Sequence, residues 1–135
     1  RGENVMKKFD NSEFEKYKAE AKERWGNTDA YTEYKEKTKD YSQEKQNSLV
    51  DEMDSIFAEF ASFMKKGEAP DSESAQKCVK LLQCHITENY YTCTKEILAG
   101  LGQMYVLDER FRENIDKHAV GTAQFACEAI AIYCR

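Results

Sequence analysis

The chain is poor in proline, glycine and long apolar runs. Its 135 residues include one proline and six glycines, and no apolar run is longer than a few residues. So few helix breakers permit long helices, which a protein of short strands and tight turns rarely shows. A run of about 20 apolar residues is needed to span a membrane, so no membrane segment is predicted. No charged-then-apolar leader precedes the first predicted helix, so we expect a cytoplasmic protein.

Close cysteine pairs are also absent. The chain has five cysteines: Cys78, Cys84, Cys93, Cys127 and Cys134. An odd number without a Cys-x-x-Cys pair argues against both a secreted disulfide framework and a structural zinc site. Cys84 and His85 are adjacent, and adjacent side chains on a helix point about 100° apart, which does not suit one tetrahedral site. We therefore expect reduced thiols, no metal and no cofactor.

Signatures of enzymes and of nucleic-acid binding are missing as well. No glycine-rich phosphate loop and no Gly-x-Ser-x-Gly turn occurs. A nucleophilic pair of Cys84 or Cys93 with His85 or His118 stays open, but no orienting carboxylate or oxyanion hole has a visible signature. The formal net charge of −5 disfavours phosphate contacts by this chain. The chain begins at Arg1 without an initiator Met, which indicates a fragment, so any DNA-binding part is expected upstream. We predict that the chain is not an enzyme.

What the chain does have is helical periodicity in the size range of one domain. Hydrophobic residues make up 41% and charged residues 33%, as in a globular protein. No stretch alternates long enough for a strand, so we predict an all-α fold in a single domain over residues 1–135. Helices are expected over about 12–25 and 28–38, from Ser42 to before Gly67, from Ser72 through Ile86, over about 92–101, from Asp108 through Ile115, and over about 120–133.

The sequence also predicts the roles of several residues within these helices. The apolar residues of the two longest helices fall on one face of each helix and are expected to form the core. Gly100 and Gly102 disfavour a helix interior, so we expect them to form a turn, the alternative being that they let the rings of a ligand come close. Asp108, Arg112 and Asp116 are spaced four apart and are expected to pair along a helix.

Residues 1–48 differ from the rest of the chain. They contain no Leu or Ile, and Lys, Arg, Asp and Glu supply 22 of these 48 positions. Short charged helices are marginal alone, so this segment must dock an aromatic face on something. Either it docks on the body of the domain, or it forms a lid that folds over a ligand bound to a core of residues 49–135. The aromatic residues concerned are Phe9, Phe14, Tyr17, Trp25, Tyr31, Tyr34 and Tyr41.

A second set of aromatic and Met residues lies in the carboxyl-terminal half. Most residues of this kind belong to a core. A cleft lined by Tyr, Met and Phe is also what a large, flat and mostly apolar ligand requires, so both interpretations stay open. The set is Tyr90, Tyr91, Met104, Tyr105, Phe111 and Phe125.

Several segments resemble the TipAS family, the ligand-sensing domain at the carboxyl end of MerR-type transcriptional activators. The resemblance covers most of the chain from about Tyr17 onward. Its longest and most unusual motifs lie in the segments 24–31 and 104–116. The segments are 17–31 (YKAEAKERWGNTDAY), 41–44 (YSQE), 67–74 (GEAPDSES), 91–93 (YTC) and 101–116 (LGQMYVLDERFRENID).

The resemblance implies a globin-like arrangement of helices with a deep cleft that binds thiopeptide antibiotics or other bulky drugs. It also implies that the amino-terminal helices are mobile when the cleft is empty and become ordered over the ligand. In the intact regulator, ligand binding is expected to act through a dimerising coiled coil on a winged-helix DNA-binding domain. Genes for drug resistance or efflux would then be activated. We expect the full-length protein to be a homodimer and this fragment a monomer.

On this resemblance we predict a non-catalytic module that recognises a large amphipathic drug. The alternative is a helical protein–protein interaction module that has no small-molecule ligand. Contacts from the lid are expected at Trp25, Tyr31 and Tyr34. The cleft is expected to be lined by Tyr91, Cys93, Gly100, Met104, Tyr105 and Phe111.

Two positions depart from the family pattern. Gly100 stands where the thiostrepton-binding type carries the cysteine that attacks a dehydroalanine of the drug, so covalent capture by that route is not expected. Lys45 and Gln46 stand where the family usually has an Asp-Trp pair, so an aromatic contact at the start of the long helix is missing. Both departures concern thiopeptide specificity rather than architecture.

Overall fold

The computed structural model describes residues 28–135, so Trp25 and the helix expected over 12–25 lie outside the described residues. All regular structure in this part is helical, which confirms the all-α prediction. None of these described helices has the length and hydropathy that a membrane span needs. The helices are α2 (Asp29–Thr38), α3 (Gln43–Lys65), α4 (Glu73–Asn89), α5 (Lys95–Leu107), α6 (Glu109–Asp116) and α7 (Thr122–Tyr133).

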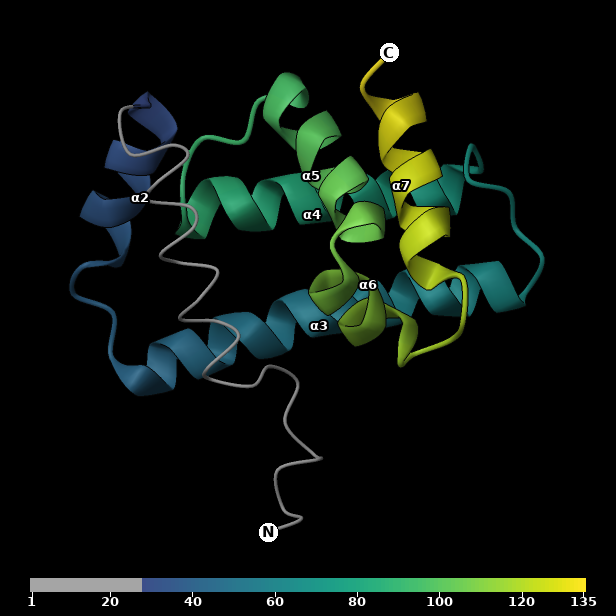
Figure 1. Cartoon of the computed structure of the whole chain (residues 1–135), viewed down its shortest axis with the longest axis horizontal. Coiled ribbons are helices and arrows are strands. Elements are labelled where there is room, and N and C mark those ends of the chain that lie inside the picture. The colour runs from purple at the N-terminus through teal and green to yellow at the C-terminus, as the bar shows by residue number, and fades with distance from the viewer. Residues whose placement is uncertain (1–27) are drawn as a thin grey trace, which may run out of the picture.

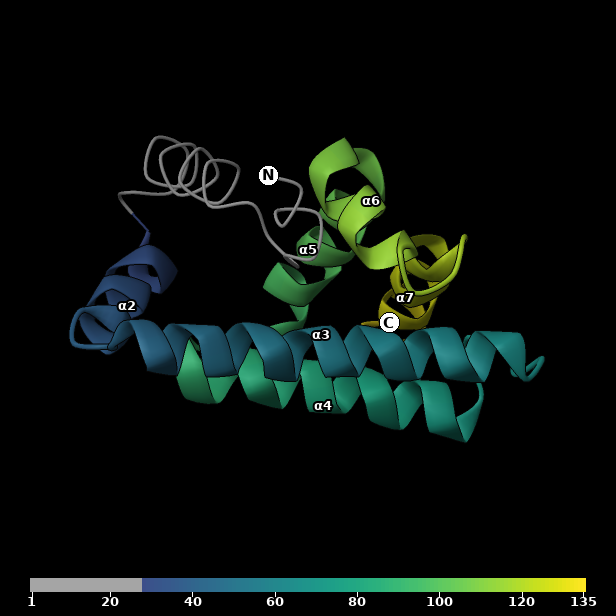
Figure 2. The ribbon, with the colours of Figure 1, turned by 90° about the horizontal axis from the view of Figure 1, so that it is seen from below.

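The two long helices α3 and α4 run antiparallel and form one layer of the domain (Figure 1). Figure 2 shows that α2, α5, α6 and α7 all lie on one side of this layer. α2 lies at the end of the layer where α3 begins and α4 ends, whereas α7 lies toward the other end. The described fold therefore consists of a body, α3 to α7, with α2 attached at one end.

Helix boundaries follow from capping residues that are visible in the sequence. Ser42 before α3 and Ser72 before α4 each accept a hydrogen bond from the backbone N–H three residues later. Gly67 follows α3 with a φ of +85°, a conformation that favours glycine. Its N–H and that of the next residue donate to carbonyls of the last turn of α3, as in a Schellman motif. The predicted boundaries at Ser42, Gly67 and Ser72 are confirmed.

The core lies between the α3–α4 layer and the helices that cover it. Phe60 of α3 and Leu82 of α4 are fully buried. The ring of Phe60 meets that of Phe125 in α7 edge-on, at 6.3 Å between ring centroids. The predicted apolar face of α4 is buried throughout, and that of α3 is buried or partly buried. The core faces predicted from periodicity are therefore confirmed.

The turn expected at Gly100 and Gly102 is wrong, because both glycines lie inside α5, which continues to Leu107. A Cβ atom built on Gly102 would lie 3.2 Å from Cγ2 of Ile130 in α7. A Cβ atom on Gly100 would meet no described atom within 4 Å. Gly102 therefore allows α7 to pack closely on the backbone of α5, whereas Gly100 has no such role in the described structure.

The ion pairs expected along the 108–116 helix are also wrong. Asp108 caps α6 as predicted, but its carboxylate pairs with Arg110, at 2.7 Å between Oδ2 and Nη2, rather than with Arg112. The hydrogen bonds from Arg110 are the main cause that holds the pKa of Asp108 below its usual range. Arg112 instead donates to the carbonyl of Val106 near the end of α5, at 3.0 Å. Both charged groups thus stabilise the junction of α5 and α6.

Asp116 has a similar role at the next junction. Its Oδ1 accepts a hydrogen bond from the N–H of Ala123 in the first turn of α7, at 2.8 Å. Gly121, which precedes α7 with a φ of +97°, has no side chain that can supply this cap. α7 consequently begins at Thr122, two residues later than expected from the sequence.

Alanine at the two glycines of α5 offers a matched pair of variants. Gly100→Ala should stabilise the chain by about 0.5–1 kcal/mol, because alanine suits a helix interior better than glycine and no described atom obstructs its methyl group. Gly102→Ala should be less stable than Gly100→Ala by about 1 kcal/mol or more, because its methyl group must displace the buried Ile130. Urea unfolding of both variants measures the difference. Equal gains would show that α7 moves away at little cost.

Candidate functional site

α2 carries two of the aromatic residues predicted as ligand contacts. Tyr31 and Tyr34 are half-buried, and their ring centroids lie 5.9 Å apart. Tyr34 stacks on Tyr90, which directly follows α4, at 6.2 Å, and Tyr90 meets His85 of α4 edge-on at 6.0 Å. Thr28 caps the helix below these rings by accepting a hydrogen bond from the N–H of Tyr31. Aromatic rings therefore join α2 to the end of α4.

A second aromatic group is formed by α5 and α6. Tyr105 is only 4% exposed. Its ring centroid lies 5.2 Å from that of Phe57 and 6.1 Å from that of Phe111. Met104 and Phe111 are partly buried and pack against the core. Among the described residues, no ring contact joins this group to the rings of α2. Met104 and Phe111 thus retain exposed surface, whereas Tyr105 contributes to the core.

The loop between α4 and α5 carries two further predicted site residues. Tyr91 is half-buried, and Cys93 is 3% exposed. The N–H of Cys93 donates to Oγ1 of Thr87 at 3.1 Å, and its carbonyl accepts from the amide of Gln83 at 2.8 Å. Burial, with a smaller effect of the nearby Cys134, raises the pKa of the Cys93 thiol to about 11. Cys93 is therefore a poor nucleophile that α4 holds in place.

Glu33 of α2 is a residue of this junction that the sequence does not single out. Its carboxylate accepts two hydrogen bonds from Thr92, one from the N–H at 2.8 Å and one from the hydroxyl at 3.0 Å. The hydroxyl of Tyr41, in the segment that follows α2, donates to the carbonyl of Asn89 at 2.7 Å. Glu33 and Thr92 are 59 residues apart in the sequence. No spacing rule indicates which of several acidic residues in α2 contacts Thr92.

His85 is a buried polar residue beneath the same junction. Its side chain is 7% exposed, and Nδ1 lies 3.4 Å from the carboxylate of Glu52 and 3.4 Å from the amide nitrogen of Asn89. Nε2 has no hydrogen-bond partner among the described residues. Burial lowers the pKa of His85, an effect that the charge of Glu52 only partly opposes. The ring is therefore neutral at pH 7.

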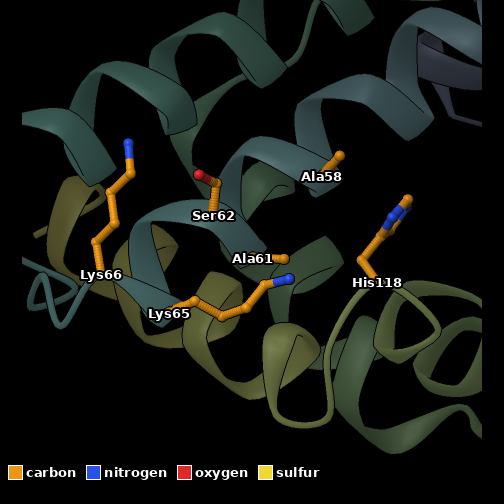
Figure 3. A pocket seen from close by; sticks show the side chains of 6 residues that line it. All are labelled: Ala58, Ala61, Ser62, Lys65, Lys66 and His118. Carbon is orange, nitrogen blue, oxygen red and sulfur yellow. The ribbon is translucent and has the colours of Figure 1, made fainter.

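A shallow hollow of about 350 Å³ lies elsewhere, on α3 beside the segment that joins α6 to α7 (Figure 3). Its lining is Ala58, Ala61, Ser62, Lys65, Lys66 and His118. Figure 3 shows Lys65 extending toward His118 and Lys66 pointing away. Asp54 lies 3.0 Å from Nε2 of His118 and 3.3 Å from Nζ of Lys117. None of the residues predicted to bind a ligand lines this hollow.

The two histidines do not form the possible Cys–His nucleophile within the described residues. His118 pairs with Asp54, and His85 lies against Glu52 and Asn89, so neither ring has a hydrogen bond to a cysteine in the described part of the chain. Within residues 28–135, no group of three or more His, Cys, Asp or Glu side chains is arranged to hold a metal ion. The described residues form two aromatic groups instead. One group contains Tyr31, Tyr34 and Tyr90, and the other contains Tyr105 and Phe111. Hydrogen bonds also join α2 and the turn after it to the end of α4 and the loop that follows.

Three comparisons identify similar proteins. The model of the TipAS antibiotic-recognition domain matches residues 17–133. The transcriptional activator TipA of Streptomyces coelicolor is 42% identical over 116 residues, which is 86% of this chain and 46% of that protein. The transcriptional activator mta of Bacillus subtilis is 39% identical over 102 residues, covering 76% of this chain and 39% of that protein. The chain thus spans less than half the length of these curated relatives.

A solved structure of TipAS from Streptomyces lividans in complex with nosiheptide, from a thiopeptide antibiotic multidrug resistance system, is also similar. It matches with a TM-score of 0.81 and 40% sequence identity, and the match covers 93% of this chain and 86% of that chain. An identity of this size extends the similarity beyond the arrangement of helices to the residues themselves.

The buried neutral His85 predicts a specific sensitivity to acid. Because the pKa of His85 in the folded chain lies below its ordinary value of 6.5, the unfolded chain binds this proton first as the pH falls. Stability should therefore be lost as the pH falls below 6.5 toward the folded-state pKa. The melting temperature of His85→Gln should fall less than that of the original chain between about pH 7 and about pH 5. Equal falls would assign the acid sensitivity to other groups.

The exposure and pKa of the thiols predict an order of alkylation. Cys84 is exposed, whereas Cys78 and Cys93 are buried and their pKa values are raised to about 12 and about 11. Because the thiolate is the reactive form, Cys84 should react first with iodoacetamide at neutral pH, and Cys93 should react only after unfolding. Peptide mass mapping over a time course measures this order. Early modification of Cys93 would show that its thiol is accessible and reactive in the folded chain.

Proposed function

Because the chain belongs to the family of TipAS antibiotic-recognition domains, we propose that it binds a bulky amphipathic drug, either a thiopeptide-like or another antibiotic, without changing it chemically. The observation that carries the proposal is the match, in fold and in sequence, to a TipAS domain that binds nosiheptide. The family recognises ligands in transcriptional regulation and is not catalytic.

In this proposal the ligand lies between the aromatic surface of the amino-terminal part and that of α5 and α6. The boundary expected after residue 48 falls inside α3, so the proposed lid is the segment before α3 and the core is α3 to α7. Cys93 and Tyr105 are buried, so in this proposal they pack beneath the lining and do not form its exposed surface. The lining itself is provided by Tyr31, Tyr34, Tyr91, Met104 and Phe111, together with Trp25 and the surface at Gly100.

The proposed binding is non-covalent. Gly100 offers no thiol, and the pKa of Cys93 is raised to about 11, so a dehydroalanine of a thiopeptide would find no activated nucleophile at these two positions. Affinity must then come from the burial of apolar surface and from hydrogen bonds. A ligand with a wide apolar area is favoured, because contacts with it offset the entropy lost when the lid becomes ordered.

For the whole protein we propose a cytoplasmic MerR-type activator of drug-resistance or efflux genes. The similarity to less than half the length of the activators TipA and mta supports this proposal, since the remaining length of those relatives can hold a DNA-binding domain. DNA binding and homodimerisation would then reside outside residues 1–135, and this chain would be a monomer. Its net charge of −5 agrees with a chain that does not contact DNA itself.

Nosiheptide binding to Trp25→Ala tests both the function and the lid. The original chain should bind nosiheptide in calorimetry, and Trp25→Ala should weaken this binding by at least about tenfold, as truncation of an aromatic residue at the centre of an interface does. The melting temperature of the empty variant should change little. Trp25→Phe is the control and should recover part of the affinity.

Two results would contradict this prediction. Parallel losses of affinity and of stability in Trp25→Ala would show that Trp25 belongs to the core. If the original chain fails to bind nosiheptide or other hydrophobic antibiotics, the aromatic surface is better explained as a contact for a partner protein.

A further inference from the structure

α2 is attached to the body by polar contacts as much as by its rings, and none of its residues is fully buried. Nζ of Lys37 donates to the carbonyl of Thr87, and the hydroxyl of Tyr41, which follows α2, donates to the carbonyl of Asn89 at 2.7 Å. Both carbonyls belong to the last turn of α4, where carbonyl groups have no partner within the helix. A cation near this end is also favoured by the helix dipole. α2 and the turn after it therefore cap α4.

The most specific contact of α2 joins Glu33 to Thr92. Both the N–H and the hydroxyl of Thr92 donate to this carboxylate, at 2.8 Å and 3.0 Å. Two charge-assisted hydrogen bonds to one residue determine its orientation as well as its position. The bond from the Thr92 N–H is the main cause that holds the pKa of Glu33 below its usual range, and Lys37, at 3.5 Å, contributes less. The carboxylate is therefore ionised at neutral pH.

Thr92 lies between Tyr91 and Cys93, which are both proposed site residues. Cys93 is held by side chains of α4 at its N–H and at its carbonyl. The N–H of Tyr91 donates to a carbonyl of α4 at 3.1 Å. Thr92, in contrast, is held from the other side, by Glu33 of α2. α2 thus supplies the hydrogen bonds described for Thr92, whereas α4 supplies those described for its two neighbours.

We propose that Glu33 is a positioning residue for antibiotic recognition, which fixes Thr92 and thereby sets the neighbouring Tyr91 for the ligand. This inference rests on the proposed function of the domain. Glu33 acts through Thr92 and need not touch the antibiotic.

The chain offers a matched control for Glu33. Glu36 is also an acidic residue of α2, but it forms an exposed ion pair with Lys39, which directly follows α2, at 3.3 Å. Glu33→Ala and Glu36→Ala each remove one carboxylate and one ion pair to a nearby lysine, and alanine suits a helix in both cases. Only the first substitution removes the contact with the loop. Melting temperatures of both variants establish that the body of the domain is folded.

Calorimetry with nosiheptide should show that Glu33→Ala binds about five- to tenfold more weakly than the original chain, as expected for lost charge-assisted hydrogen bonds. Glu36→Ala should bind within about twofold of the original chain, as expected for an exposed ion pair. In amide NMR spectra of the nosiheptide complexes, the Thr92 signal should shift in Glu33→Ala and stay in place in Glu36→Ala. Glu33→Gln, which keeps an acceptor, should restore part of the affinity.

A double-mutant cycle separates positioning from a general effect on α2. Thr92→Val removes the hydroxyl of Thr92, so Glu33→Ala should lose less affinity in this background than in the original chain. Additive losses, or equal losses for Glu33→Ala and Glu36→Ala, would overturn the positioning role while leaving the proposed function intact. Failure of the original chain to bind nosiheptide would overturn the proposed function, and this inference with it.

Discussion

The body of the domain depends on a chain of aromatic contacts that starts at Phe57 and Phe60 of α3. Phe60 is fully buried and meets Phe125 of α7 edge-on, and Phe57 meets Tyr105 of α5 in the same way. Tyr105 in turn contacts Phe111 of α6. Because edge-to-face pairs add to the free energy gained by burying large apolar side chains, these rings hold α5, α6 and α7 on one side of the α3–α4 layer.

α2 is held in a different way, and the difference bears on recognition. It has ten residues and no buried side chain, and it is attached by the stacking of Tyr34 on Tyr90 and by the hydrogen bonds of Glu33 and Tyr41. A short helix of this kind gains little from packing, which agrees with the proposed role of this segment as a lid.

The predicted site residues divide according to their position in this fold. Tyr31, Tyr34, Tyr91, Met104 and Phe111 are half-buried, which agrees with their proposed contact with a ligand. Cys93 and Tyr105 are buried, because one is held by α4 and the other belongs to the aromatic core. Composition cannot separate these two groups, since the same residue types serve both purposes. Only the direction in which each side chain leaves its helix or loop distinguishes them.

Helix caps and apolar faces are readable from the sequence, because local geometry largely determines them, although the ion pairs expected four residues apart in 108–116 are not formed. The caps at Ser42 and Asp108 and the buried faces of α3 and α4 are of this kind, and the long motifs shared with the TipAS family add its fold and its class of ligand. The close approach of α7 at Gly102 and the bonds from Glu33 to Thr92, 59 residues away, are not of this kind. The sequence by itself therefore determined most of the described helices, the caps at Ser42, Ser72 and Asp108, the core faces and the family. Only the tertiary structure decided which glycine is packed and which carboxylate holds the loop, because these contacts depend on the path of the chain between distant residues.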